Sequence, residues 1–196
     1  MPIARKKLAL FIYTLILSLQ LLISCNAFEV NKLPSRLFAS EITVLEQLIK
    51  SDAPSANKRI KLLEKHIEQY SPVQQVSFYN VKSEFLLDHG QVADAKSLAE
   101  QALELAKEHN IVNRHVPELT YTLGFAHESL GDLLQAERNY ISGIELAQLM
   151  ADETLRAKGL INLGAIYYLT EKFENSLLAL SDALDSANNL KDDELK

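Results

Sequence analysis

A period of about 40 residues is the feature of this 196-residue sequence that most constrains its fold. Three six-residue segments recur at 90–95, 131–136 and 171–176, each with an apolar residue in third place and a small residue at its end. The pair Leu123-Gly124 returns 40 residues later as Leu163-Gly164. Such self-similarity indicates a repeat protein, in which each unit buries its apolar face against its neighbours.

Each unit has the pattern of two helices. Gly90 and Gly131 suit the left-handed residue that ends a helix, and Asp132 suits the start of the next one. Apolar residues then follow at steps of four, four and three, as on one face of a helix: Ala136, Tyr140, Ile144 and Ala147. No segment combines strand-like composition with period-two alternation. We therefore expect an all-α fold in which Gly124 and Gly164 allow paired helices to approach closely.

The repeat resembles the tetratricopeptide repeat (TPR), whose pattern places Leu-Gly or Leu-Ala before an aromatic residue, a Gly-Asp-Tyr-like turn and a helix rich in alanine. The second unit matches through Thr120, Leu123, Gly124, His127, Gly131, Ala136, Tyr140 and Gly143. The third unit matches through Leu160, Leu163, Gly164, Tyr167, Ser176, Leu180 and Ala183. The first unit matches through Tyr79, Ser83, Leu86, Gly90, Ala95, Ala99 and Ala102, with Lys82 where leucine is expected. The sequence departs from the pattern in lacking tryptophan, in placing Glu171 at the third turn and in exceeding the usual period of about 34 residues.

This resemblance implies an all-α, TPR-like α-solenoid of about four antiparallel helix pairs, the first of them divergent. We expect the repeat domain at 37–196, with pairs at about 37–70, 72–110, 117–150 and 155–190. A loop is expected over 51–56, and Pro72 and Pro117 should each lie in the first turn of a helix. Residues 192–196 repeat the pattern of 152–156, so another helix is expected to begin there, either as a short end-cap or as the front of a longer protein.

The first 27 residues have the plan of an export signal. Arg5-Lys6-Lys7 precedes an uncharged, largely apolar stretch, Leu8–Ser24, as in a secretory signal peptide; an uncleaved membrane anchor is the alternative. Leu22-Ile23-Ser24-Cys25 resembles the lipobox of bacterial lipoproteins, which implies lipidation of Cys25 and a signal peptide at 1–24. A competing cleavage after Ala27 gives 1–27. In either case residues 28–36 form a tether.

The lipobox resemblance also implies a location. We expect an exported protein on the periplasmic side, and Asn26, in place of aspartate after the cysteine, points to an outer-membrane lipoprotein. A soluble periplasmic protein and an inner-membrane-anchored one remain alternatives. Because Cys25 is the sole cysteine, no disulfide within the chain is possible, and stability must come from packing.

The charge of the chain limits its partners. The net charge is −6, and removal of the basic leader leaves the remainder more acidic. Nucleic-acid binding needs clustered lysine and arginine, so no nucleic-acid partner is expected. We expect contact with a membrane only through a lipid or an N-terminal anchor.

The sequence carries no recognisable catalytic or metal-binding motif. The histidines lie too far apart for two of them to share one helix face at ligand spacing: His66, His89, His109, His115 and His127. His89 and His109 are expected in turns at helix ends, and His127 at the core aromatic position of its unit. The sequence also lacks a nucleophile elbow and a glycine-rich phosphate loop. We therefore expect a non-enzyme without cofactor or metal.

The TPR resemblance implies a ligand groove lined by the first helix of each pair. The family's groove positions fall on Asn80, Glu84, Tyr121, Phe125, Glu128, Ile161, Ala165 and Tyr168. Phe125 and Ile161 are equally compatible with packing between neighbouring pairs. Tyr121, Phe125 and Tyr168 suggest three rings that receive peptide side chains. The carboxylate clamp of chaperone-binding TPR domains is absent, which disfavours an acidic C-terminal peptide as ligand.

These observations predict a non-catalytic module that binds a protein or peptide in the bacterial cell envelope, in a scaffold or assembly role. The alternative is the truncated periplasmic sensor half of a membrane-bound signalling enzyme of the diguanylate cyclase or histidine kinase type.

Overall fold

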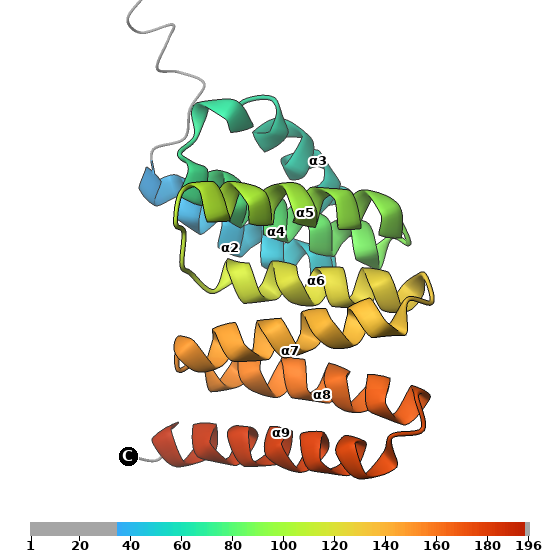
Figure 1. The fold of residues 1–196 in the computed structure, drawn as a ribbon. Helices are drawn as coiled ribbons and strands as arrows, with labels where there is room; N and C mark the ends of the chain where they lie inside the picture. The colour runs from blue at the N-terminus through green and yellow to red at the C-terminus, as the bar shows by residue number, and fades with distance from the viewer. Residues whose placement is uncertain (1–34, 195–196) are drawn as a thin grey trace, which may run out of the picture. The chain divides into compact units, whose positions relative to one another are not determined.

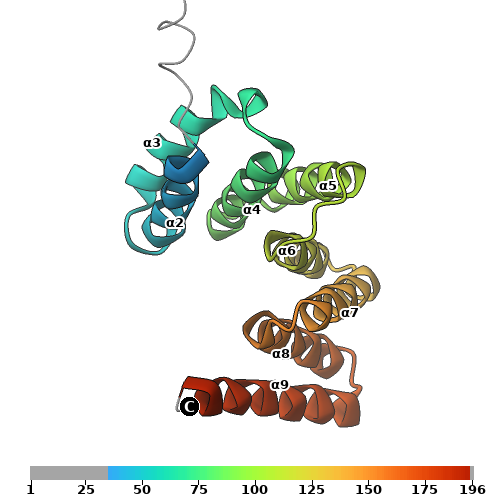
Figure 2. The same cartoon turned by 90° about the vertical axis from the view of Figure 1, so that its left-hand side faces the viewer.

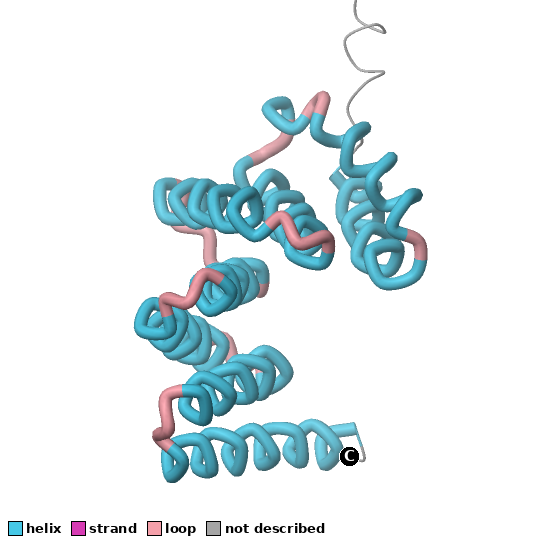
Figure 3. Tube along the Cα trace, turned by 90° about the vertical axis from the view of Figure 1, so that its right-hand side faces the viewer, coloured by secondary structure: helices cyan, strands magenta, loops and turns pink. Residues whose placement is uncertain are grey.

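The computed structural model describes residues 35–194, and this part of the chain consists of helices joined by short turns (Figure 3). The helices are α2 (Ser35–Ser51), α3 (Ala53–Glu64), the 3₁₀ helix η1 (Ile67–Gln69), α4 (Pro72–Asp88), α5 (Val92–Glu108), α6 (His115–Ser129), α7 (Leu133–Leu149), α8 (Glu153–Leu169) and α9 (Phe173–Glu194). The expected all-α class is confirmed for these residues. The expected signal peptide and Cys25 lie outside them. The last two residues of the expected tether, 35 and 36, begin α2.

The residues from 39 onward form one compact unit, in which α4 to α9 stack in sequence order (Figure 1). The second helices α5 and α7 each pack on their own first helix, α4 or α6, and on the first helix of the next pair, α6 or α8. The first helices α4, α6 and α8 also contact one another along one side of the stack, whereas α5 and α7 lie on the other side (Figure 2). This arrangement is an α-solenoid, and it leaves a surface built only from first helices.

The turns of the repeats share one hydrogen-bond geometry. After α4, the N–H of Gly90 donates to the Leu87 carbonyl and the N–H of Gln91 donates to the Leu86 carbonyl, which is the Schellman arrangement. The same two bonds recur after α5, α6, α7 and α8. The residue with positive φ is glycine at 90 and 131, as expected, but it is Asn110, Ala151 and Glu171 at the other three turns.

Side-chain caps start the helices α3, α4, α7 and α8. The Asp132 side chain accepts the backbone N–H of Gln135, as expected for an N-cap, and Asp152 caps α8 in the same way. Pro72 is the first residue of α4, and Pro117 lies in the first turn of α6. The expected loop over 51–56 is wrong. Only Asp52 interrupts the helices, because its carboxylate caps α3 while Pro54 occupies the first turn, where no N–H is needed.

Tyrosine and glycine residues interlock between α6 and α7. Tyr121 of α6 lies against Gly143 of α7, and Tyr140 of α7 lies against Gly124 of α6, where an added Cβ would be 2.6 Å from the ring. Both tyrosines are buried, at 3% and 0% exposure. The expected packing role of Gly124 is therefore confirmed, and Gly164 similarly faces Leu180 of α9. Glycine at these positions sets the distance between paired helices.

The helix expected to begin near residue 192 is not a separate element, because α9 continues without a break to Glu194. The corresponding break before α8 places Ala151 at positive φ, which costs about 1–2 kcal/mol in a residue other than glycine. The packing of α8 on α7 offsets that cost, whereas no described helix packs after α9. Among residues 35–194, no helix combines the length and the hydropathy needed to cross a membrane.

Candidate ligand-binding cavity

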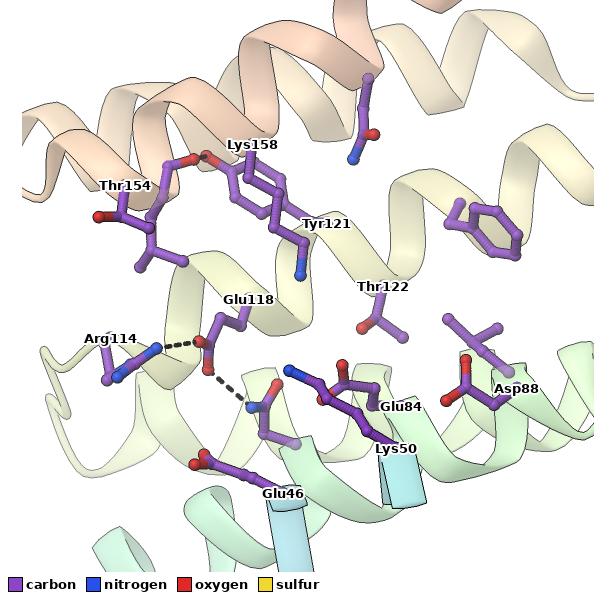
Figure 4. A pocket seen from close by; sticks show the side chains of 15 residues that line it. Glu46, Lys50, Glu84, Asp88, Arg114, Glu118, Tyr121, Thr122, Thr154 and Lys158 are labelled. Carbon is purple, nitrogen blue, oxygen red and sulfur yellow. Dashed lines mark hydrogen bonds and ion pairs between the residues drawn. The ribbon is translucent and has the colours of Figure 1, made fainter. Parts of the chain in front are cut away.

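The first helices enclose a cavity of about 450 Å³ (Figure 4). Its walls come from α2, α4, α6 and α8, the side of the stack that the second helices leave open. The lining residues are Glu46, Lys50, Asn80, Glu84, Leu87, Asp88, Arg114, Glu118, Tyr121, Thr122, Phe125, Thr154, Leu155, Lys158 and Asn162.

One end of the cavity is fixed by a hydrogen-bond network around Glu118. Arg114 Nη2 donates to Glu118 Oε1 (2.9 Å), and Asn80 Nδ2 donates to Glu118 Oε2 (2.7 Å), as the dashed lines in Figure 4 show. His115 Nδ1 lies 3.1 Å from the same Oε2. Burial alone raises the pKa of Glu118, but the hydrogen bonds and charges of His115 and Arg114 outweigh burial and lower it below the ordinary value. Glu118 is thus an ionised anchor that ties α6 to α4.

The middle of the cavity holds Glu84 between two lysines. Burial raises the pKa of Glu84, and the opposing effect of the Lys158 and Lys50 ammonium groups only partly compensates. The two lysines extend from opposite walls, Lys50 from α2 and Lys158 from α8, toward the space between them (Figure 4). A charged group of a ligand can therefore interact with Glu84 or with either lysine in this region.

Tyr121 forms the wall between α6 and α8. Its hydroxyl donates to the backbone carbonyl of Leu155 (3.0 Å), and a Cβ added to Gly159 of α8 would collide with its phenol. Burial raises the pKa of Tyr121, so the phenol remains protonated and keeps this hydrogen bond. Tyr121 is thus both a core residue and a boundary of the cavity.

The structure brings only some of the predicted groove residues together. Asn80, Glu84, Tyr121 and Phe125 line the cavity. The other predicted residues, Glu128, Ile161, Ala165 and Tyr168, do not line it. Of the three rings expected in one groove, Tyr121 and Phe125 line this cavity and Tyr168 does not. Tyr121 is buried, and the exposed Tyr168 packs edge-on against Phe173 with ring centroids 5.7 Å apart.

Two of the predicted groove residues, Glu128 and Ile161, lie outside the cavity. Glu128 Oε2 accepts a hydrogen bond from the Tyr140 hydroxyl (2.9 Å) between α6 and α7. Ile161 is 54% exposed on α8 outside the cavity, so it does not pack between pairs, and Phe125 is 45% exposed at the cavity.

Sequence reasoning missed most of the charged lining. Along α6 and α8, polar residues of the cavity correspond at a spacing of 40: Arg114 and Thr154, Glu118 and Lys158, Thr122 and Asn162. On α8, Lys158 and Asn162 lie three positions before the predicted Ile161 and Ala165, which corresponds to a rotation of about 60° around the helix. The recurrence of polar residues at that spacing was the available signal.

The histidines occupy structural positions. His89 and His109 are the C-cap residues of α4 and α5, as expected. His127 is half-buried, with Nδ1 3.8 Å from an Asp132 carboxylate oxygen, and His115 belongs to the network around Glu118. Within residues 35–194, no three histidine, cysteine or acidic side chains are grouped so as to hold a metal ion.

Comparison with solved structures identifies the architecture. The chain is similar to BtubC from P. vanneervenii, at 18% identity and a TM-score of 0.60, over 79% of this chain and 73% of that one. It is similar to the apo form of RapI at 18% identity and a TM-score of 0.63, over 91% of this chain and 65% of RapI. A signal transduction ATPase with a tetratricopeptide repeat sensor from Pyrococcus horikoshii matches at 13% identity and a TM-score of 0.59, over 80% of this chain and 25% of that chain.

The fold is a TPR-like α-solenoid. The chain spans about two thirds of RapI and a quarter of the ATPase. No protein-family model matches the sequence, and no curated protein matches it.

Proposed function

We propose that the protein is a non-catalytic module that binds a segment of another protein in the cavity between α2, α4, α6 and α8. The single observation that carries this proposal is the cavity itself, which is about 450 Å³ in volume and framed by helices of successive repeats. A cavity of this size accommodates a few residues of an extended or helical peptide. The TPR-like fold supports the proposal, because stacked repeats offer such surfaces to partners.

The chemistry of the cavity favours binding over catalysis. Carboxylates with pKa values displaced in opposite directions, as in Glu84 and Glu118, are a pattern that acid–base enzymes use. Here, however, both oxygens of Glu118 already accept hydrogen bonds, from Arg114 on one side and from Asn80 and His115 on the other. A carboxylate that is held ionised and occupied in this way is a poor proton acceptor and a good structural anchor.

Site-specific photo-crosslinking tests the proposal. A benzoylphenylalanine placed at Asn162 in the cavity wall should crosslink to a partner from envelope extract, which mass spectrometry then identifies. The same group at Lys96 on α5, a residue outside the cavity that pairs with Glu100, serves as the control. Adducts at position 96 without adducts at 162 would place the interface on the second helices and refute the proposal.

We propose further that the module acts in the cell envelope as a scaffold or assembly factor, held at the outer membrane by a lipid on Cys25. The support is the sequence Leu22-Ile23-Ser24-Cys25 at the end of an apolar leader. Radiolabelled palmitate should enter the wild-type protein and not Cys25→Ala. An unlabelled wild-type protein whose mature N-terminus is Phe28 would instead show simple secretion after cleavage at Ala27.

A further inference from the structure

Two lysines in the cavity are available to a ligand. Lys50 and Lys158 are both exposed, and their ammonium groups extend into the cavity from opposite sides (Figure 4). Neither forms an ion pair or hydrogen bond with any residue in the described part of the chain. Other lysines of the domain do form ion pairs, as Lys82 does with Glu64 and Lys172 with Glu137.

Two carboxylates of α4, Glu84 and Asp88, line the cavity together with the lysines. Glu118, at the other end, is paired with Arg114, and Glu46 also acts on Arg114 there. Burial favours the neutral form of Glu84, and neither Glu84 nor Asp88 forms an ion pair with Lys50 or Lys158. The two ammonium groups therefore remain unpaired among the described residues, and the space between them can receive an anionic group.

An apolar surface lies one helical turn farther along. Phe125 follows Thr122 by three residues on α6, and Leu87 follows Glu84 by three residues on α4. Three residues of helix correspond to a rise of about 4.5 Å. Both side chains line the cavity, and Phe125 is 45% exposed. A step of the same order as this rise separates neighbouring side chains on one side of an extended peptide, where residues two positions apart lie about 6.5 Å from each other.

The cavity wall also offers groups for a peptide backbone. The amide of Asn162 and the hydroxyls of Thr122 and Thr154 line the cavity and make no hydrogen bond with any other described residue. A peptide main chain carries one donor and one acceptor per residue, so it can satisfy these groups when it displaces water.

We infer that the cavity binds an internal, extended segment of a partner protein through an aspartate or glutamate side chain and a large apolar side chain two positions away. The acidic group lies between Lys50 and Lys158, and the apolar side chain packs on Phe125 and Leu87. This inference rests on the proposed function, and it adds the chemistry of the ligand. The acidic group belongs to a side chain rather than to a free C-terminus.

Selection from random 12-residue peptides on phage, with the purified full-length protein as bait, tests the inference. Enriched sequences are expected to carry Asp or Glu two positions from Leu, Ile, Met or Phe. The peptides are then synthesised with acetylated and amidated ends, and their Kd is measured by fluorescence polarisation. The double variant Lys50→Gln, Lys158→Gln should weaken binding about tenfold, since each exposed ion pair contributes a few-fold in affinity.

A matched double variant on α5 separates this effect from a loss of overall charge. Lys96→Gln with Lys107→Gln changes the net charge equally outside the cavity and should leave Kd unchanged. In Lys158→Glu, a peptide with lysine in place of its acidic residue should bind better than the original peptide.

Several results would overturn the inference while leaving peptide binding intact. These are enrichment of lysine or arginine, the absence of any charge preference, an equal loss of affinity in both double variants, and binding that requires a free C-terminal carboxylate. If no peptide is enriched, or if bound peptides fail to crosslink to position 162, the proposed peptide-binding function itself is wrong.

Discussion

Replacing Gly143 with alanine should destabilise the protein, although alanine is the better helix former. The added Cβ would lie closer than 3.0 Å to the Tyr121 ring. That ring cannot retreat, because Gly159 closes its other side and its hydroxyl is bonded to the Leu155 carbonyl. Overpacking costs about 1–3 kcal/mol, and the rigid surroundings place this site near the upper value. The gain in helix propensity is about 1 kcal/mol. We expect a net loss of about 2 kcal/mol.

Urea denaturation followed by circular dichroism at 222 nm measures this loss, with an expected decrease in midpoint of about 1 M. The background of the substitution tests its mechanism. In Tyr121→Leu, which lacks the ring, Gly143→Ala should become neutral or stabilising by up to about 1 kcal/mol. In Tyr121→Phe, which keeps the ring and loses only the hydroxyl, it should remain destabilising. The reasoning is refuted if Gly143→Ala has the same effect in all three backgrounds.

The remaining predictions concern a turn and two carboxylates. Glu171→Gly should stabilise the protein by about 0.5–1 kcal/mol and so raise the urea midpoint, because glycine adopts the positive φ of 59° without steric strain. Glu171→Ala should give no such gain, because alanine keeps the Cβ. Glu118→Gln should cost about 1–2 kcal/mol at pH 7. The pKa of Glu118 is lowered on folding, so its contribution is present above the ordinary value of 4.5 and is lost as pH falls below it; the variant and wild-type stabilities should then converge. Glu84→Gln should instead increase the free energy of unfolding at pH 7. The pKa of Glu84 is raised on folding, so ionisation of this carboxyl destabilises the wild type as pH rises, and the glutamine cannot ionise. A variant less stable than the wild type at pH 7 would contradict this assignment.

The helix boundaries of the repeats were predictable because their determinants are local. Gly90, Gly131 and Asp132 determine turns and caps through their own backbone preferences, and the spacing of 40 transfers those turns to units that lack glycine. Gly124 was predictable for a related reason, since glycine inside a helix is costly unless a neighbouring side chain fills its place.

The lining of the cavity was only half predictable, because the prediction followed the aromatic positions Tyr121 and Phe125 rather than the polar residues beside them on the same helix. A register of 40 residues carried from Tyr121 selects Ile161, whereas the cavity is lined by Lys158 and Asn162, the counterparts of Glu118 and Thr122 on α6. Tyr121 was predicted to be a groove ring that contacts a ligand, but its ring packs into the space left by the missing side chains of Gly143 and Gly159 and is buried. Both glycines are distant from Tyr121 in sequence, so no local pattern marks the contact.

The position of Tyr121 connects the outer layer of the solenoid to its inner face. The Tyr121 ring packs against Gly143 of α7, and its hydroxyl donates a hydrogen bond to the Leu155 carbonyl of α8. None of the residues that line the cavity belongs to α7. The separation of the α6 and α8 walls is therefore set partly by residues that no ligand can touch. A population of related proteins could retune ligand selectivity by substitutions at such hidden positions while every contact residue stayed the same. A search for specificity determinants confined to the lining would overlook them.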